Sequence, residues 1–297
     1  MCGIAGLFLK DRKLEPDLGA MLAGMLAPLS DRGPDSAGFA VYGAETPGHL
    51  KFTLRVPRRF EIERLLKALR DAGGPSVSYR VHGTHVVISV AAEAAALARQ
   101  TVEQFKDVAI VGSGRRMEIF KEVGRPEHVS RQFGLASMTG THAIGHTRMA
   151  TESAVTTNGA HPFTTGDDQC LVQNGSLSNH NAVRRELVKK GLSFQTDNDT
   201  EVAAGFITAK LHDGASLQQA MEGCLDALDG FYTFVIATEG GFGVLRDPIA
   251  CKPAVVAETD RLVAFGTEYR ALVDLPGIEA ARVWEPAPAT VYRWELH

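Results

Sequence analysis

Apolar and polar positions change along the chain in short blocks that predict a mixture of strands and helices. Residues 2–9 form a continuous apolar run typical of a buried strand, and residues 37–42 form a second one. Residues 16–29 carry leucines and methionines at helical spacing, with Pro16 in the first turn. The chain is therefore expected to start inside its own core, although chain ends are commonly exposed unless something holds them.

The remaining blocks continue this mixture to the end of the chain. We expect helices at about 61–69, 91–105, 181–190, 200–212 and 217–228, and strands at about 86–90, 108–111, 117–120, 141–149, 169–172, 232–238, 243–246, 253–257 and 262–265. No internal repeat or low-complexity linker separates these blocks. The pattern therefore favours one compact α/β domain over residues 1–297, with an inserted segment at about 45–140.

Composition narrows the class of protein. The 297 residues are 44% hydrophobic and 22% charged with a net charge of -4, which indicates a globular protein and gives no reason to expect nucleic acid or an anionic membrane as a partner. No apolar stretch approaches the roughly 20 residues of a membrane helix, and the first residues lack a secretory pattern, so a cytoplasmic location is expected. The four cysteines lack CxxC spacing, which argues against a disulfide framework and against a structural zinc site.

Cys2 is the residue whose position most changes this picture. If Met1 is removed, the new terminus carries a thiol beside a free α-amino group. The reference pKa of that group, about 7.7 to 8.0, leaves a useful fraction able to accept the thiol proton. Gly3 and Gly6 flank the site and permit close backbone approach. Cys2 is therefore a candidate nucleophile, although in an arbitrary protein it would be a small apolar residue that starts a strand.

Two further segments carry groups that an acyl-transfer nucleophile acting on an amino acid would need. In GHTRMATES, Arg148 could grip an α-carboxylate and Thr151 could add a hydroxyl, while a surface salt bridge is the alternative for the arginine. In QNGSLSNH, the side-chain amide of Asn174 and the backbone N–H of Gly175 could stabilise an oxyanion, while an ordinary Asn-Gly turn is the alternative.

A third segment, TDNDTEVAA, begins a predicted helix. Its Asp199 could accept a hydrogen bond from a substrate ammonium group. The alternative is an N-cap, because Asp before Glu and an apolar run is a common helix entry. Both roles could coexist only through different carboxylate oxygens.

Taken in order, these segments resemble the glutaminase domain of class II glutamine amidotransferases, which are N-terminal nucleophile hydrolases. The resemblance rests on CGI at the start, followed by RGPDSAG, GHTRMAT, NGAHPF, QNGS and DNDTE, and it spans most of the chain. The later segments LRDPIACKPAVVAE and AFGTEYRAL are similar to the closing strands of that family. The resemblance implies a four-layered α/β/β/α sandwich.

The same resemblance implies a role for each candidate residue. Cys2 would attack the side-chain amide of glutamine, and Asn174 and Gly175 would form the oxyanion hole. Arg148 and Asp199 would hold the α-carboxylate and α-amino groups of the substrate.

Four other residues have less defined roles by resemblance. Thr151 and His161 fall where the family lines its glutamine pocket. Arg32 and Asp35 are expected to order the loop over the pocket, and a salt-bridged turn is compatible with that role.

Two features set this chain apart from the family pattern. The segment between RGPDSAG and GHTR is long, and no synthase, phosphosugar or phosphoribosyl domain follows, so the ammonia acceptor is expected on another polypeptide. Among stand-alone versions, the chain resembles the glutamate-synthase-like amidotransferase component of N-methylglutamate synthase. That likeness implies that this chain holds no cofactor. It implies two partners, a flavin-containing synthase-like protein and a β-helical glutamate-synthase-like protein. FMN and an iron–sulfur cluster would be held by these partners. Methylamine would be the nucleophile of that complex, and Cys2 could process a γ-glutamyl amide in place of glutamine.

Three other readings remain open from the sequence. The chain could be a catalytically weak glutamine-sensing or scaffolding subunit of a glutamate-synthase-like complex. It could be a metal-dependent hydrolase built on His82 and His85 or on His142 and His146, although neither pair lies on a predicted helix that would align the rings and no nearby carboxylate completes a ligand set. It could also act on other amides, although a pair of groups suited to a zwitterionic amino acid argues against that.

Overall fold

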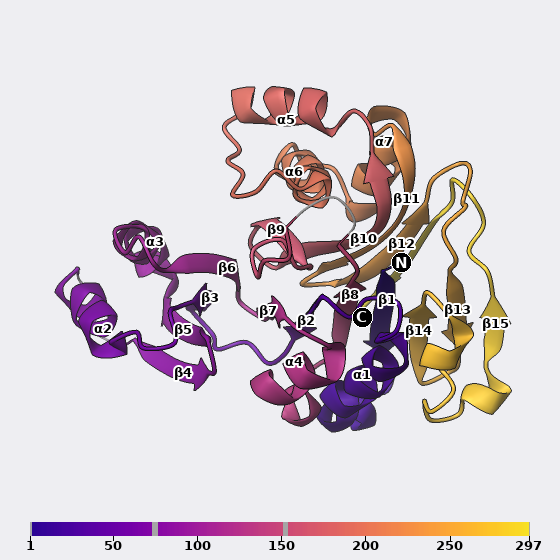
Figure 1. Cartoon of the computed structure of the whole chain (residues 1–297), viewed down its shortest axis with the longest axis horizontal. Helices are drawn as coiled ribbons and strands as arrows, with labels where there is room; N and C mark the ends of the chain where they lie inside the picture. Colours follow the sequence, from indigo (N-terminus) through magenta and orange to yellow (C-terminus); the bar gives the residue numbers. More distant parts are fainter. Residues whose placement is uncertain (1, 73–76, 151–153, 297) are drawn as a thin grey trace.

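Two β-sheets packed face to face form the centre of the molecule in a computed structural model that describes residues 2–72, 77–150 and 154–296 (Figure 1). The seven-stranded sheet contains, in spatial order, Arg282–Trp284 (β15), Val255–Glu258 (β13), Leu262–Gly266 (β14), Gly3–Leu9 (β1), His142–Arg148 (β8), Ser36–Tyr42 (β2) and Met117–Val123 (β7). The five-stranded sheet contains Val291–Glu295 (β16), Gly241–Arg246 (β12), Gly230–Thr238 (β11), Gln169–Leu177 (β10) and Phe163–Gly166 (β9).

Helices cover the two outer faces of this pair of sheets. Leu18–Leu26 (α1) and Pro126–Phe133 (α4) pack on the seven-stranded sheet, while His180–Lys189 (α5), Asp199–His212 (α6) and Leu217–Ala227 (α7) lie over the five-stranded sheet (Figure 1). The four-layered α/β/β/α sandwich expected from the sequence is therefore confirmed. The longest helix, α6, has 14 residues, and no helix among the described residues is long and apolar enough to cross a membrane.

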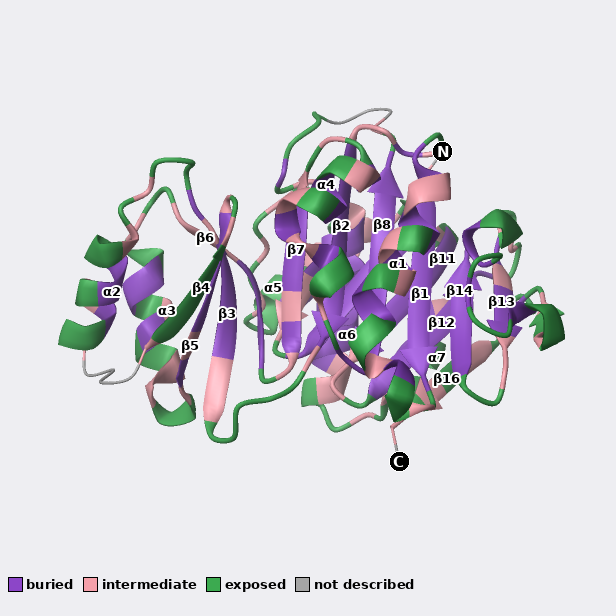
Figure 2. Cartoon of the chain, turned by 90° about the horizontal axis from the view of Figure 1, so that it is seen from below, coloured by how far each residue is buried: buried purple, intermediate pink, exposed green. Residues whose placement is uncertain are grey.

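Strand β1 shows why the apolar run at the start of the chain has no polar face. Ile4 and Phe8 point into the core between the sheets, whereas Ala5, Leu7 and Leu9 point into the core under α1. Successive side chains in a strand alternate between faces, so a strand buried on both faces must be apolar throughout. Pairing with β14 and β8 places β1 in the middle of its sheet, where it is drawn as fully buried (Figure 2).

The inserted segment forms a separate four-stranded sheet with two helices of its own. The elements are His49–Arg55 (β3), Ile62–Asp71 (α2), Ser78–His82 (β4), His85–Ala91 (β5), Ala95–Glu103 (α3) and Ala109–Gly114 (β6), and the strand order is β4-β5-β3-β6. This β-α-β-β-α-β arrangement has ferredoxin-like topology. We call residues 49–114 the inserted module, which lies beside the sandwich in Figure 1.

The structure differs from the expected boundaries of the insertion. The segment predicted at about 45–140 includes β7 and α4, but both belong to the sandwich, because β7 pairs with β2 and α4 packs in the core beneath it. Strand β3 was not expected, although Leu50, Phe52 and Leu54 alternate with polar residues in its sequence HLKFTLR, which is the pattern of a half-buried strand.

Strand β10 is longer than the sequence predicts. The strand expected at 169–172 continues to Leu177, so the alternative of an ordinary Asn-Gly turn is wrong. Asn174 pairs with Thr233, and Gly175 pairs with Tyr232, in the ladder between β10 and β11. The Asn-Gly pair therefore lies inside a sheet and not in a connecting loop.

Candidate active site

Cys2 immediately precedes β1 and is partly exposed. The backbone N–H of Met149 donates to Cys2 Sγ over 3.5 Å. The carbonyl oxygen of Cys2 accepts from Arg32 Nε at 3.0 Å and from Asn174 Nδ2 at 3.3 Å. Contacts from three separate segments of the chain thus give Cys2 a defined position.

Cys2 opens into a cavity of about 760 Å³, within the range of about 300–1,000 Å³ common for small-molecule sites. Its wall contains Arg148, His161, Gly175 and Asp199. The other lining residues are Met149, Ala154, Thr156, Asn158, Gly159, Gln173, Ser176, His180, Gln195, Thr196, Asp197, Asn198, Thr200, Phe231 and Lys252. The structure therefore brings together five residues that the sequence proposes for one site.

Gly175 lines this cavity with its backbone, and its conformation requires glycine. Its φ of 138° lies in the region that favours glycine, and a Cβ atom would stand 2.0 Å from the carbonyl oxygen of Phe231. A substrate in the cavity can thus approach the main chain next to Cys2.

Asn174 lies beside Cys2 but is not on the cavity wall. Its Nδ2 group donates to the Cys2 carbonyl oxygen at 3.3 Å and to Thr267 Oγ1 at 3.1 Å. A carbonyl oxygen can only accept, so the amide nitrogen must be the atom that faces Cys2. Both amide hydrogens are directed at protein atoms, and the bond to Cys2 is the longer of the two.

Arg148 is the last residue of β8, and it is only 7% exposed, which excludes the surface salt bridge considered from the sequence. Asp35 makes hydrogen bonds with the backbone of Arg148 and of Ala150. The Asp35 backbone N–H donates to the Arg148 carbonyl oxygen at 3.1 Å, and Asp35 Oδ2 accepts from the Ala150 N–H at 2.8 Å. Arg32, which contacts Cys2, is paired with Glu268. Hydrogen bonds from the RGPDSAG segment thus hold the backbone that surrounds the cavity.

Asp199 is the first residue of α6, and the N-cap is its neighbour Asn198, whose side chain accepts from the Thr200 N–H at 2.8 Å. The N-cap alternative for Asp199 is therefore wrong. Its Oδ2 accepts from the Leu177 N–H at 2.8 Å and from Gln173 Nε2 at 3.0 Å. These two bonds fix the carboxylate at the cavity wall.

His161 is buried behind the cavity and stacks on His146, with ring centroids 4.0 Å apart. Its Nε2 contacts Thr200 Oγ1 at 2.9 Å. Burial holds the pKa of His161 well below its usual value, and the nearby His146 and Arg148 lower it further. The ring is therefore neutral near pH 7 and can serve as a hydrogen-bonding surface but not as a cation.

Thr151, the remaining residue assigned to the glutamine pocket by resemblance, lies outside the described residues.

Two polar residues in the site were not singled out from the sequence. Gln173 is 3% exposed, lines the cavity and contacts Asp199, while Thr267 is 2% exposed and contacts Asn174. Gln173 lies within QNGS and Thr267 within AFGTEYRAL, so both belong to segments that the resemblance had already marked. Their contacts join strands far apart in the sequence, which a local pattern does not reveal.

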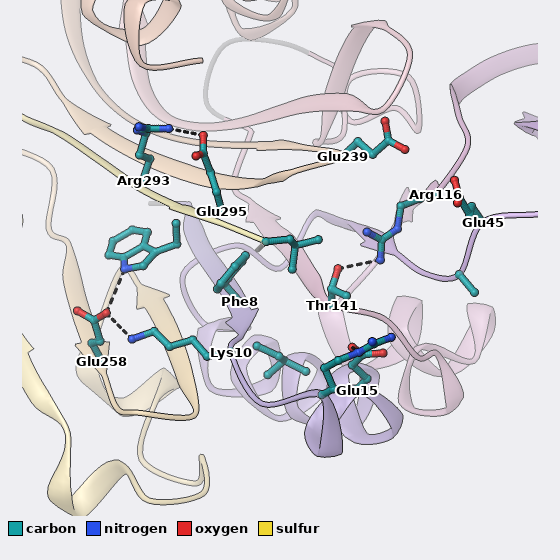
Figure 3. Close-up of a pocket in the computed structure, with 15 residues that line it drawn as sticks. Phe8, Lys10, Glu15, Glu45, Arg116, Thr141, Glu239, Glu258, Arg293 and Glu295 are labelled. Atoms are coloured by element: carbon teal, nitrogen blue, oxygen red, sulfur yellow. Dashed lines mark hydrogen bonds and ion pairs between the residues drawn. The ribbon is translucent and has the colours of Figure 1, made fainter. Parts of the chain in front are cut away.

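A larger cavity of about 890 Å³ lies at the other end of β1 (Figure 3). Phe8 lies in its wall, Lys10 pairs with Glu258 at 2.5 Å, and Arg116 donates to Thr141 Oγ1 at 3.1 Å. None of the candidate catalytic residues lines it. Size alone therefore does not identify the functional site, whereas the convergence of residues around Cys2 does.

His142 and His146, one of the two pairs considered for a metal, are held by other contacts. His142 Nε2 contacts the carbonyl oxygen of Thr238 at 2.8 Å, and His146 Nε2 contacts that of Gln173 at 3.0 Å. Over residues 2–72, 77–150 and 154–296, no group of three or more His, Cys, Asp or Glu side chains has a geometry that could hold a metal ion.

Comparison with known proteins places this chain in a family. A glutamine amidotransferase domain model matches residues 146–274. The glutamine amidotransferase-like protein GlxB of Rhizobium meliloti (strain 1021) is 58% identical over 297 residues, which covers 99% of this chain and 98% of that protein. A protein of Methanothermobacter thermautotrophicus, described as a glutamine amidotransferase, is 33% identical over 314 residues and is covered completely.

Among solved structures, glutamine phosphoribosylpyrophosphate amidotransferase from B. subtilis superposes with a TM-score of 0.63 at 19% identity. The match covers 99% of this chain and 47% of that one, so the chain spans about half the length of the solved protein and shares its fold. The four-layered sandwich, with Cys2 directly before its central strand, has the fold of the N-terminal nucleophile hydrolases. Within that class, the chain belongs to the class II glutamine amidotransferase family.

Proposed function

We propose that this protein hydrolyses the side-chain amide of glutamine through a thioester on Cys2 and delivers the released ammonia to a partner protein. The observation that carries the proposal is the cavity beside Cys2. It joins a thiol, a buried guanidinium at Arg148 and a carboxylate at Asp199 from three distant segments. A free amino acid offers matching groups: an amide to attack, an α-carboxylate and an α-ammonium.

Each step of the reaction has a candidate group. With Met1 removed, the α-amine of Cys2 accepts the thiol proton, and the sulfur attacks the carboxamide carbon to form a C–S bond. The resulting oxyanion accepts hydrogen bonds from the Gly175 N–H and the Asn174 amide. Collapse breaks the C–N bond, and the leaving nitrogen takes the proton from the α-amine to depart as ammonia. Water then cleaves the thioester, releasing glutamate and restoring the thiol.

The ends of the substrate are assigned to groups on the cavity wall. Arg148 would bind the α-carboxylate, since a guanidinium matches its planar geometry. Asp199 would accept from the α-ammonium through the oxygen that neither Gln173 nor Leu177 occupies. His161 and Thr151 would complete the pocket, the former as a neutral ring.

For the biological setting, we propose a cytoplasmic glutamate-synthase-like complex of several different chains, specifically N-methylglutamate synthase, in which this protein would be the amidotransferase component. The sequence resemblance described above supports this assignment. The partners would be a flavin-containing synthase-like protein and a β-helical glutamate-synthase-like protein, which would carry FMN and an iron–sulfur cluster, while this chain would hold none. Methylamine would be the nucleophile in that complex, and Cys2 could process a γ-glutamyl amide.

One observation favours a second candidate, a glutamine-sensing subunit with weak catalysis. Both hydrogens of the Asn174 amide are engaged with Cys2 and Thr267, so the oxyanion hole lacks one donor in this conformation. If glutamine bound without breaking the bond between Asn174 and the Cys2 carbonyl oxygen, the protein would still bind glutamine but would not hydrolyse it efficiently.

Intact mass spectrometry with the glutamine analogue 6-diazo-5-oxo-L-norleucine tests the proposal. We expect loss of Met1 and one covalent adduct, which Cys2→Ala abolishes. Cys251 is the exposed free cysteine, so Cys251→Ala is the matched control and should still be labelled. Labelling combined with ammonia release from glutamine supports the amidotransferase. Labelling without ammonia release, with the partner proteins present, favours the sensor. An adduct that survives Cys2→Ala overturns the assignment of the nucleophile.

A further inference from the structure

Thr267 connects the strand of the candidate nucleophile to the candidate oxyanion donor. It follows β14 directly and is 2% exposed. Its Oγ1 accepts from the Ile4 backbone N–H at 2.8 Å and from Asn174 Nδ2 at 3.1 Å, and its own N–H donates to the Ile4 carbonyl oxygen at 3.0 Å. One buried hydroxyl therefore contacts β1 in the seven-stranded sheet and a side chain of β10 in the other sheet.

The contact with Thr267 determines how the Asn174 amide is oriented. The two hydrogens of an amide NH₂ group lie in one plane at fixed angles. When one of them is held by Thr267 Oγ1, the direction of the other is set, and here it points to the carbonyl oxygen of Cys2. That second bond is 3.3 Å long, beyond the most frequent distance for an N–H···O bond.

We propose that Thr267 is a positioning residue that presents one N–H of Asn174 to the oxyanion formed at Cys2. The inference rests on the proposed function, because it requires Asn174 to stabilise that oxyanion. The weak bond to the Cys2 carbonyl is the one exchanged when charge develops on the substrate oxygen. The bond to Thr267 persists and limits how far the amide can move while the other N–H exchanges its partner.

The neighbouring residue supports the same arrangement. Glu268 pairs with Arg32, and Arg32 Nε donates to the Cys2 carbonyl oxygen at 3.0 Å. When Asn174 releases that oxygen, Arg32 still satisfies it. The exchange therefore leaves no buried carbonyl without a donor.

Three variants separate positioning from packing. Thr267→Val keeps the shape of the side chain and removes the hydroxyl, while Thr267→Ser keeps the hydroxyl. Thr233→Val is the matched control, because Thr233 is fully buried opposite Asn174 in the β10–β11 ladder and, among the described residues, its Oγ1 has no hydrogen-bond partner. All three are compared with the wild type in the full chain, together with its partner proteins where activity requires them.

Steady-state glutamine hydrolysis gives the first readout. Removing one oxyanion donor typically lowers kcat by 10²–10³-fold. We expect Thr267→Val to lower kcat by about tenfold to a hundredfold with KM changed less than about twofold, since the donor is displaced and not removed. Thr267→Ser should restore kcat to within about threefold, and Thr233→Val should leave it unchanged. An unchanged kcat in Thr267→Val, or no recovery in Thr267→Ser, overturns the proposal.

A double-mutant cycle tests whether Thr267 acts through Asn174. We expect Asn174→Ala to mask Thr267→Val completely, so that the single alanine variant and the double variant have equal kcat. If the two substitutions instead lower kcat by independent factors that multiply in the double variant, Thr267 has a structural role independent of Asn174, and the proposal is overturned. If Asn174→Ala itself retains full kcat, the oxyanion assignment in the proposed function fails instead.

A crystal structure of Thr267→Val supplies a readout that does not depend on turnover. We expect the Asn174 amide to rotate away from the Cys2 carbonyl oxygen. An amide that keeps both its plane and its contact with Cys2 overturns the positioning role, whatever the fate of the proposed reaction.

Discussion

Gln173 Nε2 donates to Asp199 Oδ2 over 3.0 Å, and the same oxygen accepts the Leu177 backbone N–H. A carboxylate oxygen can only accept, so the amide nitrogen of Gln173 must be on the Asp199 side. Its carbonyl oxygen then points the other way, where it is buried and has no hydrogen-bond partner within the described chain. Asp199 and Gln173 together form an acceptor pair suited to an ammonium group.

The first prediction concerns this acceptor pair. Asp199→Asn removes the charge opposite the substrate ammonium. The asparagine oxygen would keep the bonds from Gln173 and Leu177, so its NH₂ group would face the ammonium, donor against donor. We expect KM for glutamine to rise by about tenfold to a hundredfold, which corresponds to the loss of one charge-assisted contact of about 1.5–3 kcal/mol, with a smaller change in kcat. Steady-state kinetics measure both.

Asp213→Asn is a suitable control, because Asp213 is an exposed carboxylate paired with Lys190 and does not line the cavity. Gln173→Leu should raise KM less than Asp199→Asn does. An unchanged KM in Asp199→Asn would contradict the assignment of the ammonium site.

The second prediction concerns Gly175. With φ at 138° and a Cβ position only 2.0 Å from the Phe231 carbonyl oxygen, Gly175→Ala must displace the backbone of β11. We expect a loss of at least about 2 kcal/mol in the free energy of unfolding and the loss of labelling at Cys2. Urea unfolding and intact mass measure the two effects.

Gly24→Ala provides the comparison. Gly24 is exposed in α1 and has no atom within 4 Å of its Cβ position, so alanine should stabilise the protein by up to about 1 kcal/mol. Equal stability of the two alanine variants would show that β11 accommodates the side chain.

The sequence predicts the sandwich well where a strand is apolar on both faces, as at β1, or where a helix follows clear start signals, as at α6. It fails at Asn174 and Gly175, because an Asn-Gly pair is a strong turn signal whenever local chemistry alone is considered. Here the ladder with β11 overrides that signal. Tertiary pairing, which local pattern cannot contain, decides the conformation.

The candidate site shows the same limit. Cys2, Arg148 and Asp199 are suggested by side-chain chemistry and by the resemblance, and they meet at one cavity. Thr267 is not suggested, since its hydroxyl acts on residues 263 and 93 positions away in the chain. Supporting contacts of this kind become visible only when the strands are placed in space.

The third prediction is a pH dependence of stability that originates at His142. The ring is fully buried, stacks on Tyr42 and donates from Nε2 to the Thr238 carbonyl oxygen, so Nδ1 accepts from the Thr141 hydroxyl. Burial lowers the pKa of His142 from 6.5 to about 3. Between these values the unfolded chain binds a proton that the folded chain does not, so the free energy of unfolding falls as pH drops below 6.5.

At pH 5.5 this single group should cost about 1.4 kcal/mol relative to pH 7.5. His142→Gln keeps a donor for Thr238 and does not titrate, so it should lose about 1.4 kcal/mol less than the wild type does over that interval. Urea unfolding at the two pH values gives the difference, in which the contributions of other histidines cancel. Identical losses in both proteins would mean that His142 is protonated equally in the folded and unfolded states.

The fourth prediction concerns the inserted module, which enters and leaves the sandwich at neighbouring points. Tyr42 at the end of β2 pairs directly with Met117 at the start of β7, and the Gly43 N–H donates to the Arg116 carbonyl oxygen at 3.1 Å. Residues 44–115 could therefore be replaced by the two-residue turn Asn-Gly, which suits an antiparallel hairpin. We expect the shortened protein to fold with reduced stability, because Phe120 loses its ring contacts with His82 and His85.

The module also touches the candidate site, since Gln195 on the cavity wall donates to the Ile110 carbonyl oxygen of β6 at 3.4 Å. If the module serves partner contacts, the shortened protein should keep its Cys2 adduct with the diazo-ketone and fail to co-purify with the proposed synthase-like partners. If the shortened protein still co-purifies with these proteins, the module is not needed for the interface between them. A shortened protein that folds, as judged by near-ultraviolet circular dichroism, but is not labelled would assign the module to the glutamine site, because the contact between Ile110 and Gln195 would then be needed to form the cavity.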